Sequence, residues 1–173
     1  MAGENSVRPA PLTHHDSAAH RRLIAERANA IAYEEGQFIP TLEFASLGDL
    51  SNAYSEQVGY FWRIGPLVYF SLALVVTPTF TTSSGALRVL GLPYQSSSDH
   101  EPSVGTLWLN GSGVTWPSSR TAPVAWVDEG QSYMRVHVSG SGSNSVAISA
   151  ADVSSGVELS IRANGFYPIQ RNA

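Results

Sequence analysis

Residues 54–94 alternate short apolar runs with turn residues, and this alternation limits the folds open to the chain more than any other feature. The longest run, Leu67 to Val76, is interrupted only by Ser71 and is far shorter than the roughly 20 residues of a membrane-spanning helix. Gly65 and Pro66 precede it, and a later run stops at Gly91, Leu92 and Pro93. Such runs between turn residues predict β-strands. Because the long run is continuous, we expect a central strand buried on both faces.

The same pattern continues to the end of the chain. Residues 133–138 alternate apolar and polar side chains, which predicts a strand with one face in water. Short strands at short intervals favour an all-β fold, here an antiparallel, jelly-roll-like β-sandwich. Its expected core includes Phe70, Leu72, Leu74, Val89 and Leu92. The strands are expected at 38–45, 53–58, 60–64, 67–76, 85–91, 104–109, 112–116, 123–128, 132–139, 144–149 and 156–164.

Residues 1–36 differ from the rest of the chain. The first twelve are polar and contain two prolines, so they read as an extended arm. From Thr13 to about Glu35, good helix formers predict an α-helical stem that stops at Gly36. Ile24, Ala28 and Ile31 fall at helical spacing and form one apolar stripe. We therefore expect two parts: residues 1–36 for attachment and oligomerisation through this stripe, and residues 37–173 as the β-domain. The stripe could instead pack on the β-domain of its own chain.

Composition excludes several classes of function. Charged residues make up 14% of the chain, about half the ordinary share. The net charge is −4 with no basic face, so nucleic acid is not an expected partner. The chain has no cysteine and therefore neither disulfides nor thiolate zinc sites. Its N-terminus has no apolar signal segment, and we expect a soluble protein made in the cytoplasm, without membrane insertion.

Residues with catalytic or metal-binding potential are few. His14, His15, Asp16 and His20 are the one cluster of possible metal ligands, and we read them as solvated residues of a first helical turn, with Asp16 favouring the helix N-terminus. The acids of the β-domain mostly lie in expected turns, where aspartate stabilises the loop. The dense groups at 99–101 and 128–129 lie on loops and do not make an acid–base pair across a substrate. No phosphate loop, nucleophile elbow or cofactor motif is present, so we expect no enzyme activity, no cofactor and no metal.

Aromatic residues offer a better indication of a binding site. A flat aromatic face can stack on the apolar face of a sugar ring, while serine, asparagine and aspartate supply hydrogen bonds. Trp108 and Trp126 alternate with apolar neighbours and are expected in the core. Trp116 lies between glycine and proline and could be buried or exposed. The candidate contacts with a host surface are Trp116, Tyr94, Ser97, Asp99 and His100.

Residues 54–93 contain an ordered series of motifs: a tyrosine with a glutamine three residues on, Gly-x-aromatic, Arg-Ile-Gly, an apolar strand, Ser-Gly and a closing Gly-Leu-Pro. Near the C-terminus, residues 151–156 form an Ala-x-x-Ser-Ser-Gly turn before the last strand. The positions of the first series are Tyr54, Gln57, Gly59, Phe61, Arg63, Ile64, Gly65, Val68, Phe70, Ser84, Gly85, Leu87, Gly91, Leu92 and Pro93. The order of these motifs resembles a domain of small tailed-bacteriophage virion proteins, of the tail-fibre and head-fibre type, that is also found in phage-derived particles, and the resemblance covers about 38–169. Phe61 replaces the usual tyrosine and Pro66 the usual asparagine, and both fit the same turn geometry.

This resemblance implies a structural protein of the virion, attached through its N-terminal arm and helix to other virion proteins and assembled as a homotrimer. The β-domain is then expected to project outward and to bind host-surface glycan. Two alternatives remain. The chain could be a decoration or adaptor protein without a receptor, or a carbohydrate-binding module of a cellular protein.

Overall fold

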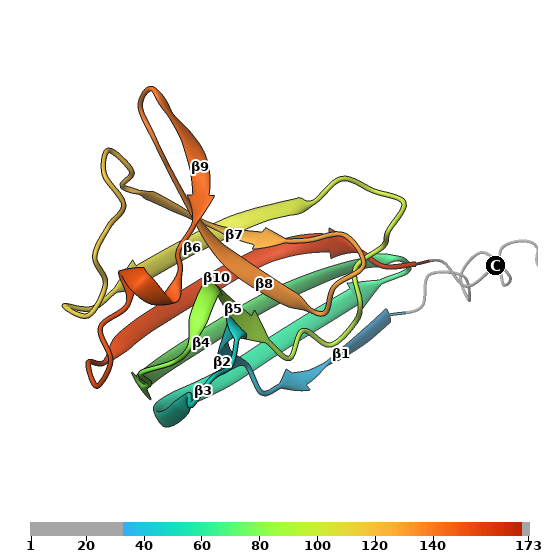
Figure 1. Ribbon diagram of the computed structural model, residues 1–173. Coiled ribbons are helices and arrows are strands. Elements are labelled where there is room, and N and C mark those ends of the chain that lie inside the picture. Colours follow the sequence, from blue (N-terminus) through green and yellow to red (C-terminus); the bar gives the residue numbers. More distant parts are fainter. Residues whose placement is uncertain (1–32, 171–173) are drawn as a thin grey trace, which may run out of the picture. The chain divides into compact units, whose positions relative to one another are not determined.

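The computed structural model describes residues 33–170, and these residues form one antiparallel sheet of ten strands (Figure 1). The all-β expectation is thereby confirmed, whereas the expected helical stem lies outside the described residues. The sheet is accompanied by one 3₁₀ turn, η1 (Ala150–Asp152). The strands are β1 (Tyr33–Phe38), β2 (Thr41–Ser46), β3 (Ser51–Ile64), β4 (Leu67–Thr79), β5 (Ser84–Leu90), β6 (Ser103–Asn110), β7 (Ala122–Val127), β8 (Tyr133–Gly140), β9 (Ser143–Ala147) and β10 (Leu159–Pro168).

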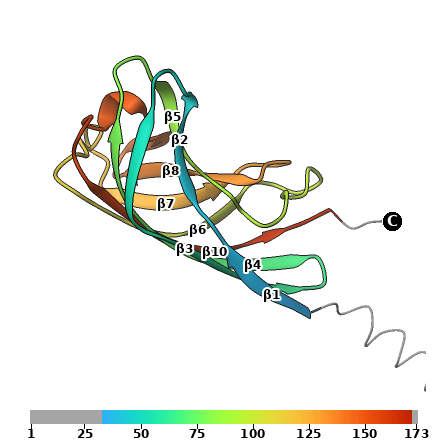
Figure 2. The ribbon, with the colours of Figure 1, turned by 90° about the horizontal axis from the view of Figure 1, so that it is seen from below.

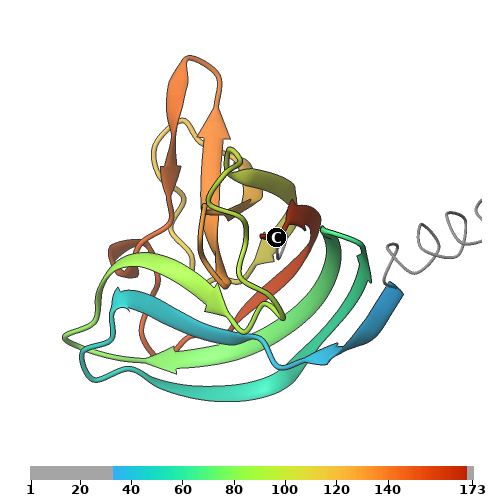
Figure 3. The same cartoon turned by 90° about the vertical axis from the view of Figure 1, so that its right-hand side faces the viewer.

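The order of strands requires the sheet to curl. It runs β1-β3-β4-β10-β6-β7-β8-β5-β2, with β9 added beside β8. Strands β1 and β2 follow each other in the chain but lie on opposite edges, and only Ile39 and Pro40 connect them (Figure 2). Two residues can join these edges only if the edges come close, so the sheet bends around a single core (Figure 3). The described residues thus form one curled sheet instead of the two separate sheets of the expected sandwich.

Side chains of β3 close the seam where β2 meets the first half of β3. The Leu42 amide donates to the Tyr54 hydroxyl over 3.0 Å, and Asn52 Nδ2 donates to the Leu42 carbonyl over 2.8 Å. Gln57 Nε2 donates to the Pro40 carbonyl over 3.0 Å. These bonds replace a strand ladder along the free edge of β2, an edge that would otherwise offer unpaired backbone groups.

The other half of β3 interlocks with β1 through two glycine–aromatic pairs. Gly36 is opposite Phe61, and Phe38 is opposite Gly59. A Cβ atom at Gly59 would lie 2.6 Å from the Phe38 ring, and one at Gly36 would lie 2.7 Å from the Phe61 ring. Each glycine therefore makes room for the ring across from it. Gly36 was expected to end a helix, but it lies within β1, whose pairing with β3 holds it there.

Strand β4 supplies the centre of the core. Val68, Phe70, Leu72, Leu74 and Val76 point inward and are buried. The residues between them are mostly half-buried, so the expectation of burial on both faces was wrong: the outer face of this strand is only partly covered. The five predicted core residues are all buried, as expected (Phe70, Leu72, Leu74, Val89 and Leu92).

Several element boundaries differ from the expected ones. The compact β unit starts at Tyr33 instead of residue 37, because residues 33–36 belong to β1. Expected strands 53–58 and 60–64 are one strand, β3, with a bulge between Tyr54 and Glu56. Residues 112–116 form a loop held by a single bridge from Val114 to Val153. Among residues 33–170, no helix is long and apolar enough to cross a membrane.

Candidate functional site

The outer face of β3, β4 and β10 carries an exposed aromatic ridge, formed by Trp62, Tyr69 and Phe166. Backbone register places Trp62 beside Tyr69 and Tyr69 beside Phe166. The ring centroids lie 5.5 Å and 4.8 Å apart, within the range of favourable aromatic contacts. Phe166 is nevertheless 56% exposed. The ridge therefore presents two exposed rings to solvent, Trp62 and Phe166, with the half-buried Tyr69 between them.

Further apolar side chains extend this surface. Ile64 and Leu67 are exposed on the turn side of the ridge, and Val104 is exposed on β6 beyond Phe166. Soluble monomers rarely leave large contiguous apolar surface uncovered, and such surface marks interaction sites. The ridge is consequently a candidate interface.

A groove of about 480 Å³ lies beside the ridge on the same outer face. Tyr60 of β3 borders one side and Trp108 of β6 borders the other, with β4 and β10 between them. The groove has a low floor because the side chains that β4 turns to it, Ser71 and Ala73, are small, while Leu72 between them is buried in the core. Trp108 was expected in the core, but it is 50% exposed because its strand turns this position outward.

Polar groups line the β10 part of the groove. The Arg162 guanidinium makes two hydrogen bonds to the Glu56 carboxylate, of 2.7 Å and 3.3 Å. The Thr106 hydroxyl donates to Asn164 Oδ1 over 2.8 Å. The only two formal charges in the groove lining, Arg162 and Glu56, pair with each other and cancel. The groove thus combines two exposed rings with a hydrogen-bonding lining of no net charge.

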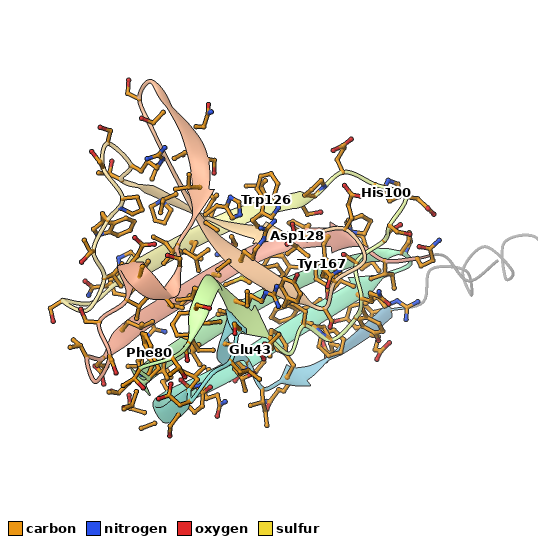
Figure 4. The ribbon with its side chains drawn as sticks, in the orientation of Figure 1. Glu43, Phe80, His100, Trp126, Asp128 and Tyr167 are labelled. Carbon is orange, nitrogen blue, oxygen red and sulfur yellow. The ribbon has the colours of Figure 1, made fainter. Side chains whose placement is uncertain are left out.

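Trp126 differs from Trp108, although both lie on outward positions of neighbouring strands. Its ring stacks on His137 with centroids 4.8 Å apart, and its indole N–H donates to Asp128 over 2.9 Å (Figure 4). Asp128 also accepts a hydrogen bond from Arg135. Trp126 is half-buried in this cluster, so the core expectation for it was right only in part.

Four of the five predicted host contacts lie on one loop tied to the end of β10. Tyr94 packs edge-on against Phe61 at 5.7 Å, and burial raises the pKa of its hydroxyl. Ser97 is buried and donates its amide proton to the Pro168 carbonyl. Asp99 accepts a hydrogen bond from Gln170, whereas His100 is exposed. A hollow of about 470 Å³ borders this loop; its lining includes Ser97, Asp99 and His100, but not Tyr94.

The fifth residue, Trp116, lies elsewhere. It is 37% exposed on the loop after β6, where the Thr115 amide donates to the Asp152 carbonyl near the start of β10. Loop 94–100 adjoins the other end of β10, a strand of ten residues. Figure 4 shows His100 at one end of the sheet and Phe80 at the opposite end. The predicted contacts therefore do not form one site.

The remaining candidates have structural partners or lie outside the described residues. Asp128 binds Trp126 and Arg135, and within residues 33–170 no three acids or histidines cluster as metal ligands. Asp49 accepts hydrogen bonds from Thr81 and Thr82, which hold the pKa of its carboxyl well below the usual range. The described part excludes the predicted oligomerisation residues Ile24, Ala28 and Ile31, and the cluster of His14, His15, Asp16 and His20.

Sequence reasoning missed the groove, although a signal for it was present. If Gly59 and Phe61 point inward, alternation turns Tyr60 and Trp62 outward. The pairing of β6 with β10 was not readable from the sequence, and this pairing is what brings Trp108 to the same face.

No protein-family model and no curated protein matches the chain. Among solved structures, the crystal structure of the Dettilon tailspike protein is similar, with a TM-score of 0.56 and 21% sequence identity. The match covers 79% of this chain and 24% of the tailspike chain, so this chain corresponds to about a quarter of that protein. At this identity the likeness concerns the fold, and the curled antiparallel sheet is a fold that also occurs within a tailspike.

Proposed function

We propose that this chain is a structural protein of a bacteriophage virion, a fibre or spike component that assembles as a homotrimer and contributes to adsorption to host-surface glycan. The observation that carries the proposal is the exposed aromatic ridge. The sequence resemblance to fibre-type virion domains and the fold likeness to the Dettilon tailspike protein support the same conclusion.

The ridge is suited to contact between copies of the chain. Its three rings already contact one another, so covering them requires little loss of side-chain freedom. Removing such apolar surface from water favours association by roughly 25 cal/mol per Å². Low overall charge reduces the repulsion between copies. Under the proposal, Ile24, Ala28 and Ile31 add a second contact among N-terminal segments and with other virion proteins.

The two ends of the curled sheet take different roles in this proposal. The first described residue, Tyr33, pairs with Ile64 beside the turn that adjoins Pro168. Loop 111–121, with Trp116, lies at the end of the sheet away from Tyr33, and the proposal gives adsorption to this end. Adsorption needs no covalent step, because several weak sites on one particle act together.

The oligomeric state tests the proposed assembly. Light scattering of the full chain should give about three times its mass of 18.5 kDa. Replacing both Trp62 and Phe166 by glutamate should weaken the trimer and lower this mass, with an unchanged β-type circular dichroism spectrum. Leu47→Glu, which alters an exposed apolar residue away from the ridge, should remain trimeric. A monomeric wild-type chain would contradict the proposal.

Location and adsorption test the virion role. Immunogold labelling should find the protein on intact particles, and its absence from them would overturn this role. Trp116→Ala should reduce particle adsorption while the melting temperature is unchanged, since a half-exposed stacking residue contributes little to the core. If neither the Trp116 variant nor variants of the groove alter adsorption, the alternative is favoured: a decoration or adaptor protein without a receptor.

A further inference from the structure

We propose that the groove between Tyr60 and Trp108 is a saccharide-binding site for an uncharged, hydroxyl-rich glycan. This inference rests on the proposed adsorption role and adds to it a site on the face of the sheet, at residues that differ from the expected loop contacts.

The two bordering rings supply the stacking surfaces. Tyr60 is 42% exposed and Trp108 is 50% exposed, and they stand on β3 and β6 with two strands between them. At about 4.8 Å between neighbouring strands, β3 and β6 are separated by roughly 14 Å. The volume of about 480 Å³ falls within the roughly 300–1,000 Å³ typical of small-molecule sites. Both rings can therefore border one extended ligand.

The floor supplies hydrogen bonds at fixed positions. Register aligns Tyr60, Ser71, Asn164 and Thr106 in one row across the four strands. Asn164 Oδ1 accepts the hydrogen bond from the Thr106 hydroxyl, so the side-chain amide nitrogen of Asn164 can donate to a ligand. The Ser71 hydroxyl beside it can donate or accept. Alternating donors and acceptors between two rings match a sugar, whose hydroxyls surround an apolar ring face.

The charges indicate a neutral ligand. Arg162 and Glu56 neutralise each other, and both groups remain partly exposed at the groove. A carboxylate or phosphate ligand would compete with Glu56 for the guanidinium and would meet the Glu56 charge. A hydroxyl group can instead donate to the carboxylate or accept from the guanidinium without separating the pair.

The experiment uses the full-length protein and an array of immobilised bacterial surface polysaccharides, both neutral and anionic. We expect binding to neutral members that is insensitive to salt, since no net charge is involved. Trp108→Ala and Asn164→Ala should each weaken binding to the best neutral member by roughly tenfold or more. Leu47→Ala is the control: it truncates an exposed apolar residue outside both the groove and the ridge, and should bind as the wild type does.

Three results would overturn the site. Absence of binding to every array member is the first. The second is binding that survives both groove substitutions but is lost in Trp116→Ala, which keeps the adsorption role and moves it to the loop. The third is loss of the trimer mass in Trp108→Ala, since the groove would then be a contact between subunits. Failure of the virion proposal is recognised separately, by absence of the protein from particles.

Discussion

Tryptophan side chains are packed differently in two parts of the outer sheet face. On β7 and β8, Trp126 is held by a histidine ring, a carboxylate and, through that carboxylate, an arginine. On β6, Trp108 borders the groove and half of its surface meets solvent. Both tryptophans point outward, so strand alternation alone does not distinguish them. The difference is whether the chain supplies polar and aromatic partners for the ring.

This difference separates stability from recognition. Where the chain encloses its own outward aromatic residues, their removal should cost folding energy. Where it leaves them open across β3, β4, β10 and β6, their removal should cost assembly or ligand binding while the fold survives. Similar substitutions in the two parts of the outer face should therefore give different phenotypes.

The two sides of β4 should give the largest contrast in stability. Phe70→Ala opens a cavity in the core and should cost about 3–5 kcal/mol. Tyr69→Ala, one position along and on the ridge, should cost about 1 kcal/mol, which corresponds to one or two lost aromatic contacts. Urea denaturation of both variants measures this difference. Equal losses would mean that the ridge packs as a second core.

The two tryptophans provide the next contrast. Trp126→Ala should cost about 2 kcal/mol, below the value for a fully buried aromatic, because it loses the stack and one hydrogen bond to a charged acceptor. Trp108→Ala should stay within about 0.5 kcal/mol, as for most surface positions. Thermal unfolding followed by circular dichroism would distinguish them. If Trp108→Ala lost as much stability as Trp126→Ala, the Trp108 ring would be packed against the protein and would not be open to a ligand.

These contrasts also show what the sequence could predict. The strands followed from local patterns, because turn residues and alternation act within a few neighbouring positions. The core residues of β4 and β5 were predictable for the same reason. Closure of the sheet was not predictable, since it depends on Tyr54, Asn52 and Gln57 reaching backbone groups at residues 40–42. Two of these three, Tyr54 and Gln57, belong to the motif that resembles fibre-type domains, and the structure gives them a physical role at the seam.

The candidate site was less predictable than the fold for a similar reason. A groove on a sheet face is assembled from one or two residues of each of several strands, and their register is a long-range property. Loop residues such as Tyr94 and Ser97 looked like contacts by composition. In the structure, loop 94–100 is anchored to the last strand by Ser96 and Ser97, and its tyrosine packs against Phe61.

The stability contributed by the part of the outer face around Trp126 should also depend on pH, and this effect should be smaller than the effects of the substitutions above. Burial lowers the pKa of His137, and the neighbouring Arg135 adds to this, while Asp128 opposes it. The unfolded chain therefore binds a proton more readily, and stability is full above about pH 6.5 and decreases as pH falls below it. His137→Gln should flatten the dependence of the melting temperature on pH between about 7.5 and 5.5. Trp126→Phe keeps a ring over the histidine and should retain the slope; an unchanged slope in His137→Gln would assign it to another group.

The smallest effect of pH on stability should come from Asp49, which lies at the end of the sheet away from Tyr33. Its carboxylate accepts hydrogen bonds from the backbone and side chains of Thr81 and Thr82, which join the β2–β3 turn to the β4–β5 turn. Because these bonds lower its pKa, their contribution is full above about pH 4 and is lost as pH falls further. The carboxylate is open to solvent, so the change in melting temperature should be slight.

Asp49→Asn keeps one acceptor but removes the charge. The stability of this variant should therefore decline less than that of the wild type between about pH 5 and 3. Thr81→Val keeps the charge, removes one donor and should show an intermediate decline. Neither substitution should alter the measured oligomeric state or the proposed glycan binding, because neither touches the ridge or the groove. A change in binding by Asp49→Asn would show that this end of the sheet takes part in recognition, and the division between the enclosed and the open face would then be incomplete.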